Sequence, residues 1–191
     1  MLKDKKIVLG ITGGIAAYKA VEVASRLRQA GAEVHVIMTK EAREFVTELT
    51  FREISGNPVA SDMWAPVAHW NVAHIALAKM ADLMLIAPAT ANILSKAALG
   101  IADDMLTTTL LATKAPIFFA PAMNSNMYEN PVTQQRIAEL KERGCHIIEP
   151  ASGHLACNVN GVGRLPEPED IVAAIDRFFL GAETLRGKKV L

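Results

Sequence analysis

Short, continuous runs of mostly apolar residues recur along the chain and are separated by longer amphipathic segments. The runs cover Lys6–Gly10, Val34–Met38, Leu83–Ala87, Ile117–Ala120 and His146–Ile148. They lack the polar alternation of a half-exposed strand, which is typical of strands buried on both faces of a parallel sheet. We therefore predict that each run forms a core strand.

Helical periodicity fills the segments between these runs. We predict helices over residues 15–29, 39–46, 50–56, 90–99, 104–113, 131–143 and 168–180. Gly31 suits the end of the first helix, and Asp103 or Asp104 suits the start of the helix over 104–113. Residues 60–73 and 151–165 have no clear period and are interpreted as loops. The alternation of strands and helices predicts an α/β fold, a doubly wound, Rossmann-like or flavodoxin-like parallel sheet sandwiched by helices in a single domain.

The composition is that of an ordinary compact protein. The chain has 191 residues, of which 51% are hydrophobic, enough for one sizeable core. Lys+Arg and Asp+Glu both number 20, so no excess of positive charge indicates nucleic acid or a membrane surface as a partner. No apolar run approaches the roughly 20 residues of a membrane span. Two cysteines and no zinc-like Cys/His spacing favour a cytoplasmic protein without a bound metal.

The end of the sequence echoes its beginning. Gly187–Leu191 reads as the first residues of another strand, much as Asp4–Leu9 does. We expect residues 1–180 to form one domain, and residues 181–191 to form a linker and the first residues of a truncated following domain. The alternative interpretation is a natural frayed tail.

Two glycines directly follow the first predicted strand, in Thr12-Gly13-Gly14-Ile15. Glycine lets the backbone approach an anion, and the start of a helix supplies free N–H groups with partial positive charge. The segment lacks the third glycine of the dinucleotide fingerprint and the Gly-Lys-Ser/Thr of a P-loop. It indicates either a tight strand–helix turn or a site for a single phosphate, as on a mononucleotide.

Two other predicted strands end in hydroxyl and amide side chains. Thr39 follows the second strand and is either a helix cap or a phosphate contact. Thr90, Ala91 and Asn92 follow the third strand, where small side chains suit the edge of a planar ring. A capped helix start explains Thr90, but it explains Asn92 less readily.

The segment Pro121–Tyr128 follows the fourth predicted strand. Ligands of parallel sheets bind beyond the carboxyl ends of the strands, which makes this segment a candidate site. Asn124 can donate and accept hydrogen bonds without carrying charge, and Met123 and Met127 offer an adaptable apolar wall. The segment is either a turn or the wall of a site for a ligand that is partly flat and apolar and partly carboxylate or amide. The two residues between Asn124 and Met127 are interpreted as spacers.

Two further side chains suit proton transfer. His74 precedes an apolar segment and titrates near neutrality, although a lone histidine is more often structural. Cys157 lies in the glycine-rich residues 153–164, which indicates a thiol on a flexible flap that closes over a ligand. Cys145 starts a predicted strand and is interpreted as a small core residue.

Together these motifs resemble the homo-oligomeric flavin-containing cysteine decarboxylases. The matching features, in chain order, are Gly13-Gly14-Ile15, His74, the Pro-Ala-Met-Asn-x-x-Met-aromatic segment and Ala156-Cys157-Asn158. The resemblance covers about residues 5–180, and the Pro-x-Met-Asn-x-x-Met part is its specific element. Two departures are Tyr128, where the family usually has Trp, and Asn158-Val159, where Gly-Asp is common.

The resemblance implies an FMN-dependent decarboxylase. Within the family, the sequence is most similar to members that convert 4'-phosphopantothenoylcysteine to 4'-phosphopantetheine in coenzyme A biosynthesis. In that reaction the thiol-bearing carbon is oxidised to a thioaldehyde, loss of CO₂ gives an enethiol, and the flavin then reduces the enethiol. Residues 1–180 would be the FMN-binding decarboxylase domain, and residues 181–191 would lead into a fused phosphopantothenate–cysteine ligase.

The resemblance also assigns roles to individual residues. His74 would assist the oxidation, Asn124 would bind the substrate carboxylate, and Cys157 would protonate the enethiol. Met127 and Ala156 would complete the substrate site. The implied FMN contacts are Thr12, Gly13, Gly14, Ile15, Thr39, Phe45, Thr90, Ala91, Asn92 and Met123. The flavin would lie between the subunits of a trimer, and the trimers would assemble into a dodecamer.

Three alternatives remain at this point. A flavin prenyltransferase of the same fold is disfavoured by the Asn124-x-x-Met127 segment and the Cys157 flap. A non-catalytic flavin-binding regulatory protein is disfavoured by the presence of His74, Asn124 and Cys157 together. A dehydrogenase that uses NAD is disfavoured by the incomplete glycine fingerprint.

Overall fold

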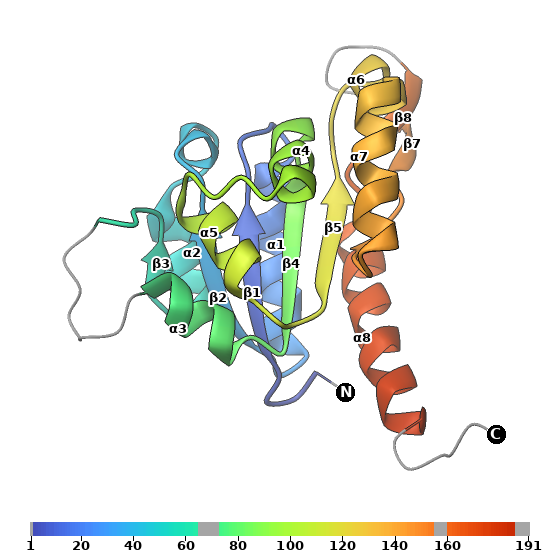
Figure 1. Ribbon diagram of the computed structural model, residues 1–191. Helices are drawn as coiled ribbons and strands as arrows, with labels where there is room; N and C mark the ends of the chain where they lie inside the picture. Colours follow the sequence, from blue (N-terminus) through green and yellow to red (C-terminus); the bar gives the residue numbers. More distant parts are fainter. Residues whose placement is uncertain (1, 65–72, 155–159, 186–191) are drawn as a thin grey trace.

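A six-stranded parallel sheet forms the centre of the molecule, and helices cover both of its faces (Figure 1). The computed structural model describes residues 2–64, 73–154 and 160–185. The strands of this sheet are β1 (Lys6–Ile11), β2 (Glu33–Met38), β3 (Val59–Ala60), β4 (Leu83–Ala89), β5 (Ile117–Pro121) and β6 (His146–Ile147). Their order is β3-β2-β1-β4-β5-β6, and all neighbours pair in parallel. The order reverses between β1 and β4, which confirms the doubly wound prediction.

The helices form two layers, one on each face of the sheet. They are α1 (Ala17–Gln29), the 3₁₀ helix η1 (Glu41–Glu44), α2 (Glu48–Ser55), α3 (Ala73–Met80), α4 (Ala91–Leu99), α5 (Met105–Ala112), α6 (Ser125–Glu129), α7 (Pro131–Glu142) and α8 (Pro168–Leu185). Buried residues of α1, α2 and α8 form the core on one face, and those of α4, α5 and α7 form the core on the other. Helix α3 packs beside α5 in the second layer.

Alternate strand residues point into these two cores. In β1, Leu9 faces the α1 layer and Val8 faces the opposite layer, and both are fully buried. In β4, Leu85 and Met84 divide between the layers in the same way. Both faces of the strand are therefore apolar, which explains why these segments read as continuous hydrophobic runs. Burial of each such side chain contributes about 1.5–3 kcal/mol.

Some element boundaries differ from the predictions. Strand β6 lies at the edge of the sheet with His146 exposed, because no strand within the described residues pairs with its outer side; the prediction of a core strand was wrong in this respect. The segment 39–46 forms the 3₁₀ helix η1 in place of a longer helix. Helix α8 begins as predicted and continues past residue 180 to Leu185.

Two segments interpreted as loops contain regular structure. The segment 60–73 includes the end of β3 and the start of α3, with residues 65–72 outside the described part. The segment 151–165 contains an antiparallel pair, β7 (Ala151–His154) and β8 (Asn160–Arg164). This hairpin is rich in glycine and has no apolar alternation, so the sequence carried no strand signal. In the described ranges, no helix is both long and apolar enough to cross a bilayer.

Candidate active site

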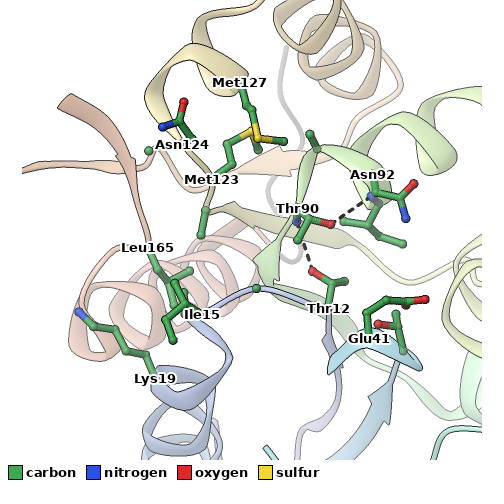
Figure 2. A pocket seen from close by; sticks show the side chains of 18 of the residues that line it. Thr12, Ile15, Lys19, Glu41, Thr90, Asn92, Met123, Asn124, Met127 and Leu165 are labelled. Carbon is green, nitrogen blue, oxygen red and sulfur yellow. Dashed lines mark hydrogen bonds between the residues drawn. The ribbon is translucent and has the colours of Figure 1, made fainter. Parts of the chain in front are cut away.

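A cavity of about 830 Å³ opens beyond the carboxyl ends of β1 and β4, where the strand order reverses. This is the crevice in which doubly wound sheets bind their ligands. Its volume lies within the roughly 300–1,000 Å³ of small-molecule sites. The lining comes from the segments after β1, β2, β4 and β5, and from the end of hairpin strand β8 (Figure 2). The structure therefore brings together sequence motifs that are far apart along the chain.

Thr12 joins the two central strands at the floor of the cavity. Its Oγ1 donates to the carbonyl oxygen of Pro88 at 2.7 Å and accepts from the backbone N–H of Thr90 at 3.3 Å (Figure 2). Thr12 is only 2% exposed, and both functions of its hydroxyl are used within the protein. Thr12 thus holds the ends of β1 and β4 together, and only its methyl and backbone groups face a cofactor. Thr90 caps α4 by accepting from Ile93 N at 3.4 Å, which leaves its O–H hydrogen to donate.

The glycine turn and the start of α1 form the anion-binding part of the cavity. Gly13 and Gly14 line it, and a Cβ at Gly13 would collide with the side chain of Glu41. Helix α1 starts after Ala16 with no capping side chain and no acidic residue in its first turn. Ala17 N and Lys19 N donate to Gly14 O and Ala16 O within this turn, so the N–H groups of Gly14 and Ile15, together with the helix dipole, suit a phosphate. Thr39 also lines the cavity; its Oγ1 accepts from Ala42 N at 3.3 Å, which leaves the O–H hydrogen to donate.

Ile15, Ala91 and Asn92 complete the predicted cofactor wall around this anion site. Ile15 is 59% exposed and lines the cavity, so it offers an apolar surface to a ligand. Together with the anion site, these residues offer an apolar surface and hydrogen-bonding groups at one end of a single cavity. The residues present therefore fit a flat cofactor that carries one phosphate.

The Pro121–Tyr128 segment forms the opposite wall, as predicted. Asn124 is the N-cap of the short helix α6, and its Oδ1 accepts from Asn126 N at 2.9 Å. This bond orients the side chain, whose Nδ2 group carries the hydrogens that can donate to a ligand. Met123 and Met127 also line the cavity, and Met127 is 50% exposed. The segment that reads as a turn in the sequence is thus a helix start.

The β7–β8 hairpin holds this wall in place. Met123 N donates to Gly163 O at 2.9 Å, and a Cβ at Gly163 would collide with Met123 O. Ser125 is 8% exposed, and a Cβ at Gly161 would fall on its Oγ. Ser125 is therefore a contact point for the hairpin, and its interpretation as a spacer was incomplete. Residues Ala156 and Cys157 of the predicted flap lie outside the described residues.

Four charged side chains that the sequence analysis did not assign to the site also line the cavity: Lys19, Glu41, Asp104 and Arg164. Lys19 pairs with Glu167 at 3.1 Å, and Arg164 pairs with the same carboxylate. The hydrogen bond from Lys19 is the main cause that lowers the pKa of Glu167 below its usual range. No sequence signal marked Lys19, because its partner lies 148 positions away in the chain.

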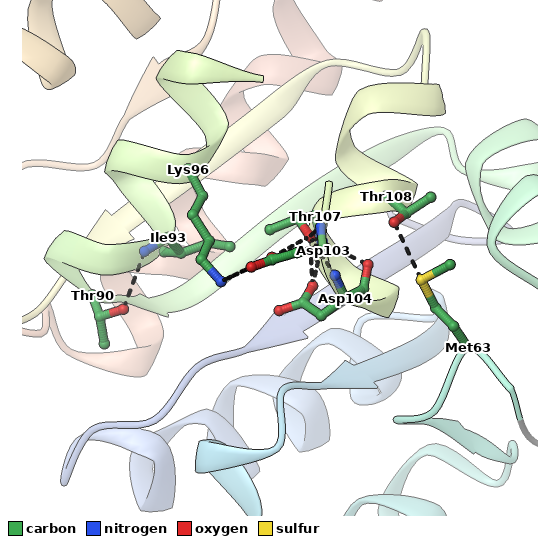
Figure 3. Close-up of polar contacts among 8 residues, drawn as sticks. All are labelled: Met63, Thr90, Ile93, Lys96, Asp103, Asp104, Thr107 and Thr108. Atoms are coloured by element: carbon green, nitrogen blue, oxygen red, sulfur yellow. Dashed lines mark hydrogen bonds and ion pairs between the residues drawn. The ribbon is translucent and has the colours of Figure 1, made fainter. Parts of the chain in front are cut away.

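Asp104 is fixed at the cavity edge by a capping box (Figure 3). Its Oδ1 accepts from Thr107 N at 2.7 Å and from Thr107 Oγ1 at 2.8 Å. This confirms the prediction that one of the two aspartates caps the helix. The neighbouring Asp103 pairs with Lys96 at 2.8 Å, and that hydrogen bond lowers the pKa of Asp103.

Two predicted site residues do not line the cavity of their own chain. His74 lies in the first turn of α3, and its Nδ1 is buried without a hydrogen-bond partner among the described residues. Phe45 follows η1 and is 47% exposed. Their roles in the site stay predictions.

The fold and the cavity together define an α/β flavin-binding protein. The chain belongs to the Flavoprotein family, whose model matches residues 1–180. It is 49% identical over 190 residues to the Coenzyme A biosynthesis bifunctional protein CoaBC of Vibrio vulnificus (strain YJ016), covering 100% of this chain and 47% of that protein. It is 47% identical over 193 residues to the protein of the same name from Bacillus subtilis (strain 168), covering 48% of it. The chain thus spans about half the length of the curated relatives it matches.

Solved structures share the fold over almost the whole chain. A mutant PPC decarboxylase, with serine in place of a cysteine and complexed with pantothenoylaminoethenethiol, matches with a TM-score of 0.84 and 31% identity. That match covers 93% of this chain and 99% of the other. The FMN-dependent cysteine decarboxylase SpaF matches with a TM-score of 0.82 and 32% identity, covering 96% and 99%.

Proposed function

We propose that this chain is an FMN-dependent decarboxylase that converts 4'-phosphopantothenoylcysteine to 4'-phosphopantetheine in coenzyme A biosynthesis in the cytoplasm. The observation that carries the proposal is one cavity, walled on one side by the anion-binding start of α1 and on the other by Asn124 and Met127. The likeness to PPC decarboxylase and to the bifunctional CoaBC proteins supports this assignment.

The residues around the cavity divide between cofactor and substrate. The FMN phosphate would be held by the N–H groups at Gly14 and Ile15 and by the hydroxyl of Thr39, and Thr90 and Asn92 would contact the rest of the cofactor. The flavin supplies reversible two-electron oxidation of the thiol-bearing carbon of the substrate. This oxidation matters because a carboxylate leaves readily only when a neighbouring C=S group can accept the electron pair.

Protein groups bind the substrate and move its protons. The Nδ2 group of Asn124 donates to the substrate carboxylate, and Met127 packs against the aliphatic part. His74 takes up or orients the thiol proton during the oxidation, and Cys157, beside Ala156, delivers a proton to the enethiol. Because the enethiol is reduced in the last step, turnover leaves the flavin in its starting oxidation state.

The proposed site includes groups from more than one subunit. His74 and Phe45 are outside the cavity of their own chain, and Ile15 and Met127 are exposed around it. Both observations support a neighbouring chain at the site, which we propose to be that of a homotrimer with FMN between subunits, with the trimers assembled into a dodecamer as the family resemblance implies. A neighbouring chain then supplies the histidine and covers the apolar rim.

The likeness to the relatives supports the domain organisation that we propose for the whole protein. Residues 1–180 form the decarboxylase domain, and residues 181–191 lead into a phosphopantothenate–cysteine ligase domain in the whole protein. The CoaBC relatives are bifunctional and about twice as long as this chain, which supports the proposal. In the described part, the connection begins as a continuation of α8 through Leu185.

The test is to purify the protein and record its flavin absorbance, then incubate it with 4'-phosphopantothenoylcysteine. We expect a yellow protein with FMN bound, release of CO₂, and 4'-phosphopantetheine identified by mass spectrometry. A protein that retains no FMN, or that binds FMN and leaves the substrate intact, would contradict the proposal.

A further inference from the structure

Two basic side chains share one carboxylate at the edge of the cavity. Lys19 Nζ lies 3.2 and 3.1 Å from the two carboxylate oxygens of Glu167, and Arg164 also pairs with that carboxylate. Lys19 comes from the first turn of α1, and Arg164 is the last residue of β8. Both line the cavity, so two separate elements bring positive charge to one part of its wall.

The cluster keeps one excess positive charge. Two cations face a single carboxylate, and the five N–H donors of an arginine exceed what one carboxylate can accept. The side chain of Lys19 is only 17% exposed, so its charge is largely removed from water. Lysine in the first turn of a helix is also opposed by the helix dipole. Glu167 offsets part of this cost, and an anionic ligand beside the two cations would offset more of it.

The charged residues divide the cavity into two ends. Lys19 lies on the side of Ile15 and Leu165, whereas Glu41 lies beside Thr12 on the other side (Figure 2). Asp104 is held by α5 within the second helix layer, so it too is remote from α1. One end of the cavity is thus positive and the other negative.

The positive end adjoins the proposed substrate wall. Arg164 directly follows Gly163, whose carbonyl accepts from Met123 N at 2.9 Å, next to Asn124. Leu165, fully buried, and Ile15 lie between this wall and Lys19 (Figure 2). A ligand held at Asn124 by its carboxylate could therefore run over an apolar surface toward the two cations.

The reaction proposed above brings two phosphates to this cavity, one on the cofactor and one on the substrate. The N–H groups of Gly14 and Ile15 before α1 and the hydroxyl of Thr39 suit the first, and the Cβ and backbone of Glu41 lie against the neighbouring Gly13. We propose that Lys19 and Arg164 bind the 4'-phosphate of the substrate, and that Glu167 holds their side chains in position. This inference rests on the proposed function and identifies the residues that select the phosphorylated substrate.

The same contacts could serve only to fasten α1 to α8. The chain offers a matched control, because Arg26 on α1 pairs with Glu22 and with Glu169 on α8, and none of these residues lines the cavity. Arg26→Gln removes a tie between the same two helices and leaves the cavity unchanged. A loss of preference for the phosphorylated substrate in the Lys19 and Arg164 variants, but not in Arg26→Gln, would therefore indicate phosphate binding and not helix fastening.

The experiment compares 4'-phosphopantothenoylcysteine with pantothenoylcysteine as substrates. It uses the FMN-loaded wild type, Lys19→Gln, Arg164→Gln and Arg26→Gln. The wild type should prefer the phosphorylated substrate, and each cavity variant should reduce this preference in kcat/KM about 10-fold or more, because a hydrogen bond to a charged group is lost. The change should lie mainly in KM for the phosphorylated substrate, and kcat/KM for pantothenoylcysteine should fall less. Arg26→Gln should keep the wild-type preference.

Calorimetric titration with 4'-phosphopantetheine and pantetheine provides a second measurement. The Lys19 and Arg164 variants should discriminate less between these two ligands than the wild type does.

The possible outcomes are distinct. If the wild type decarboxylates both substrates equally, or if both variants keep its preference, the phosphate site is refuted while the decarboxylase assignment stands. If the variants lose FMN with no change in preference, the pair holds the cofactor and the inference is wrong. If the wild type acts on neither substrate, the proposed function fails first.

A salt titration of the wild type tests the site even if a Gln variant does not fold. Added salt should reduce the preference for the phosphorylated substrate, since screening weakens charge contacts. A preference independent of salt would count against the site.

Discussion

The backbone N–H of Met123 donates to the carbonyl oxygen of Gly163 at 2.9 Å, which joins the substrate wall to the β7–β8 hairpin. Gly163 has φ 132°, and a Cβ there would collide with Met123 O. Only glycine satisfies both conditions, because the backbone conformation is strained for other residues and the space is already filled.

We therefore expect Gly163→Ala to destabilise the protein by about 1–3 kcal/mol or more and to reduce kcat/KM. At roughly 2–4 °C per kcal/mol, the fall in Tm should be measurable by calorimetry. Gly181→Ala is the control, since no atom lies within 4 Å of the new Cβ and alanine is the better residue in α8. Equal Tm values for Gly163→Ala and wild type would contradict this account of the junction.

Thr12→Val should loosen the floor of the cavity. Valine has a similar shape but leaves Pro88 O and Thr90 N without their buried partner, at a cost of about 1–3 kcal/mol. We expect a lower Tm and a higher dissociation constant for FMN, measured by flavin fluorescence. Thr12→Ser keeps the hydroxyl and should retain most of the FMN affinity. The explanation is wrong if Thr12→Ser and Thr12→Val lower the Tm and the FMN affinity to the same extent.

Asn124→Asp tests the proposed carboxylate contact without removing the helix cap. Aspartate caps a helix as well as asparagine does, so α6 should remain intact. The substrate carboxylate, however, loses a donor and meets a like charge, and we expect kcat/KM to fall at least about 10- to 100-fold. Asn130→Asp is the matched control, because Asn130 caps α7 in the same way, with Oδ1 accepting from Val132 N at 2.9 Å. A similar loss in both variants would point to a structural effect.

Much of this architecture could be predicted from the sequence, for a physical reason. Strands buried on both faces need apolar residues at every position, so β1, β2, β4 and β5 were visible as runs. The hairpin was not, since its glycines and polar residues pair with each other and carry no hydrophobic period. Asn124 was ambiguous because the same side-chain hydrogen bond makes a turn or caps a helix. Lys19 carried no signal in the sequence, because only the folded chain brings Glu167 to it.

The phenol of Tyr128 gives a prediction for alkaline pH. Burial, together with the hydrogen bond that Tyr128 donates to Glu149 at 3.0 Å, raises its pKa from 10.0 to about 12. The pKa of Tyr128 is higher in the folded protein than in the unfolded chain. Its contribution to the free energy of unfolding is therefore complete below about pH 10 and is lost as pH rises toward 12. Ultraviolet phenolate absorbance after a rapid pH jump should show this step, and Tyr128→Phe should remove it. Glu149→Gln should lower the pKa of Tyr128 only in part, since burial is the larger cause of the rise. A return to the ordinary value would show that the hydrogen bond to Glu149 is the larger cause.

Cys157→Ser should separate the two halves of the proposed reaction. Serine is a much weaker acid than cysteine, so oxidation and loss of CO₂ should proceed while reduction of the enethiol stalls. Mass spectrometry should then detect the enethiol in place of 4'-phosphopantetheine. Full turnover to 4'-phosphopantetheine by this variant would exclude Cys157 as the proton donor.

The β7–β8 pair is hydrogen-bonded into a sheet of its own, apart from the six-stranded sheet. Apart from Gly161 and Gly163, which contact the Pro121–Tyr128 segment, its sequence can therefore change without shifting the register of any strand in the six-stranded sheet. The scaffold that builds the cavity and the hairpin that borders it can vary separately.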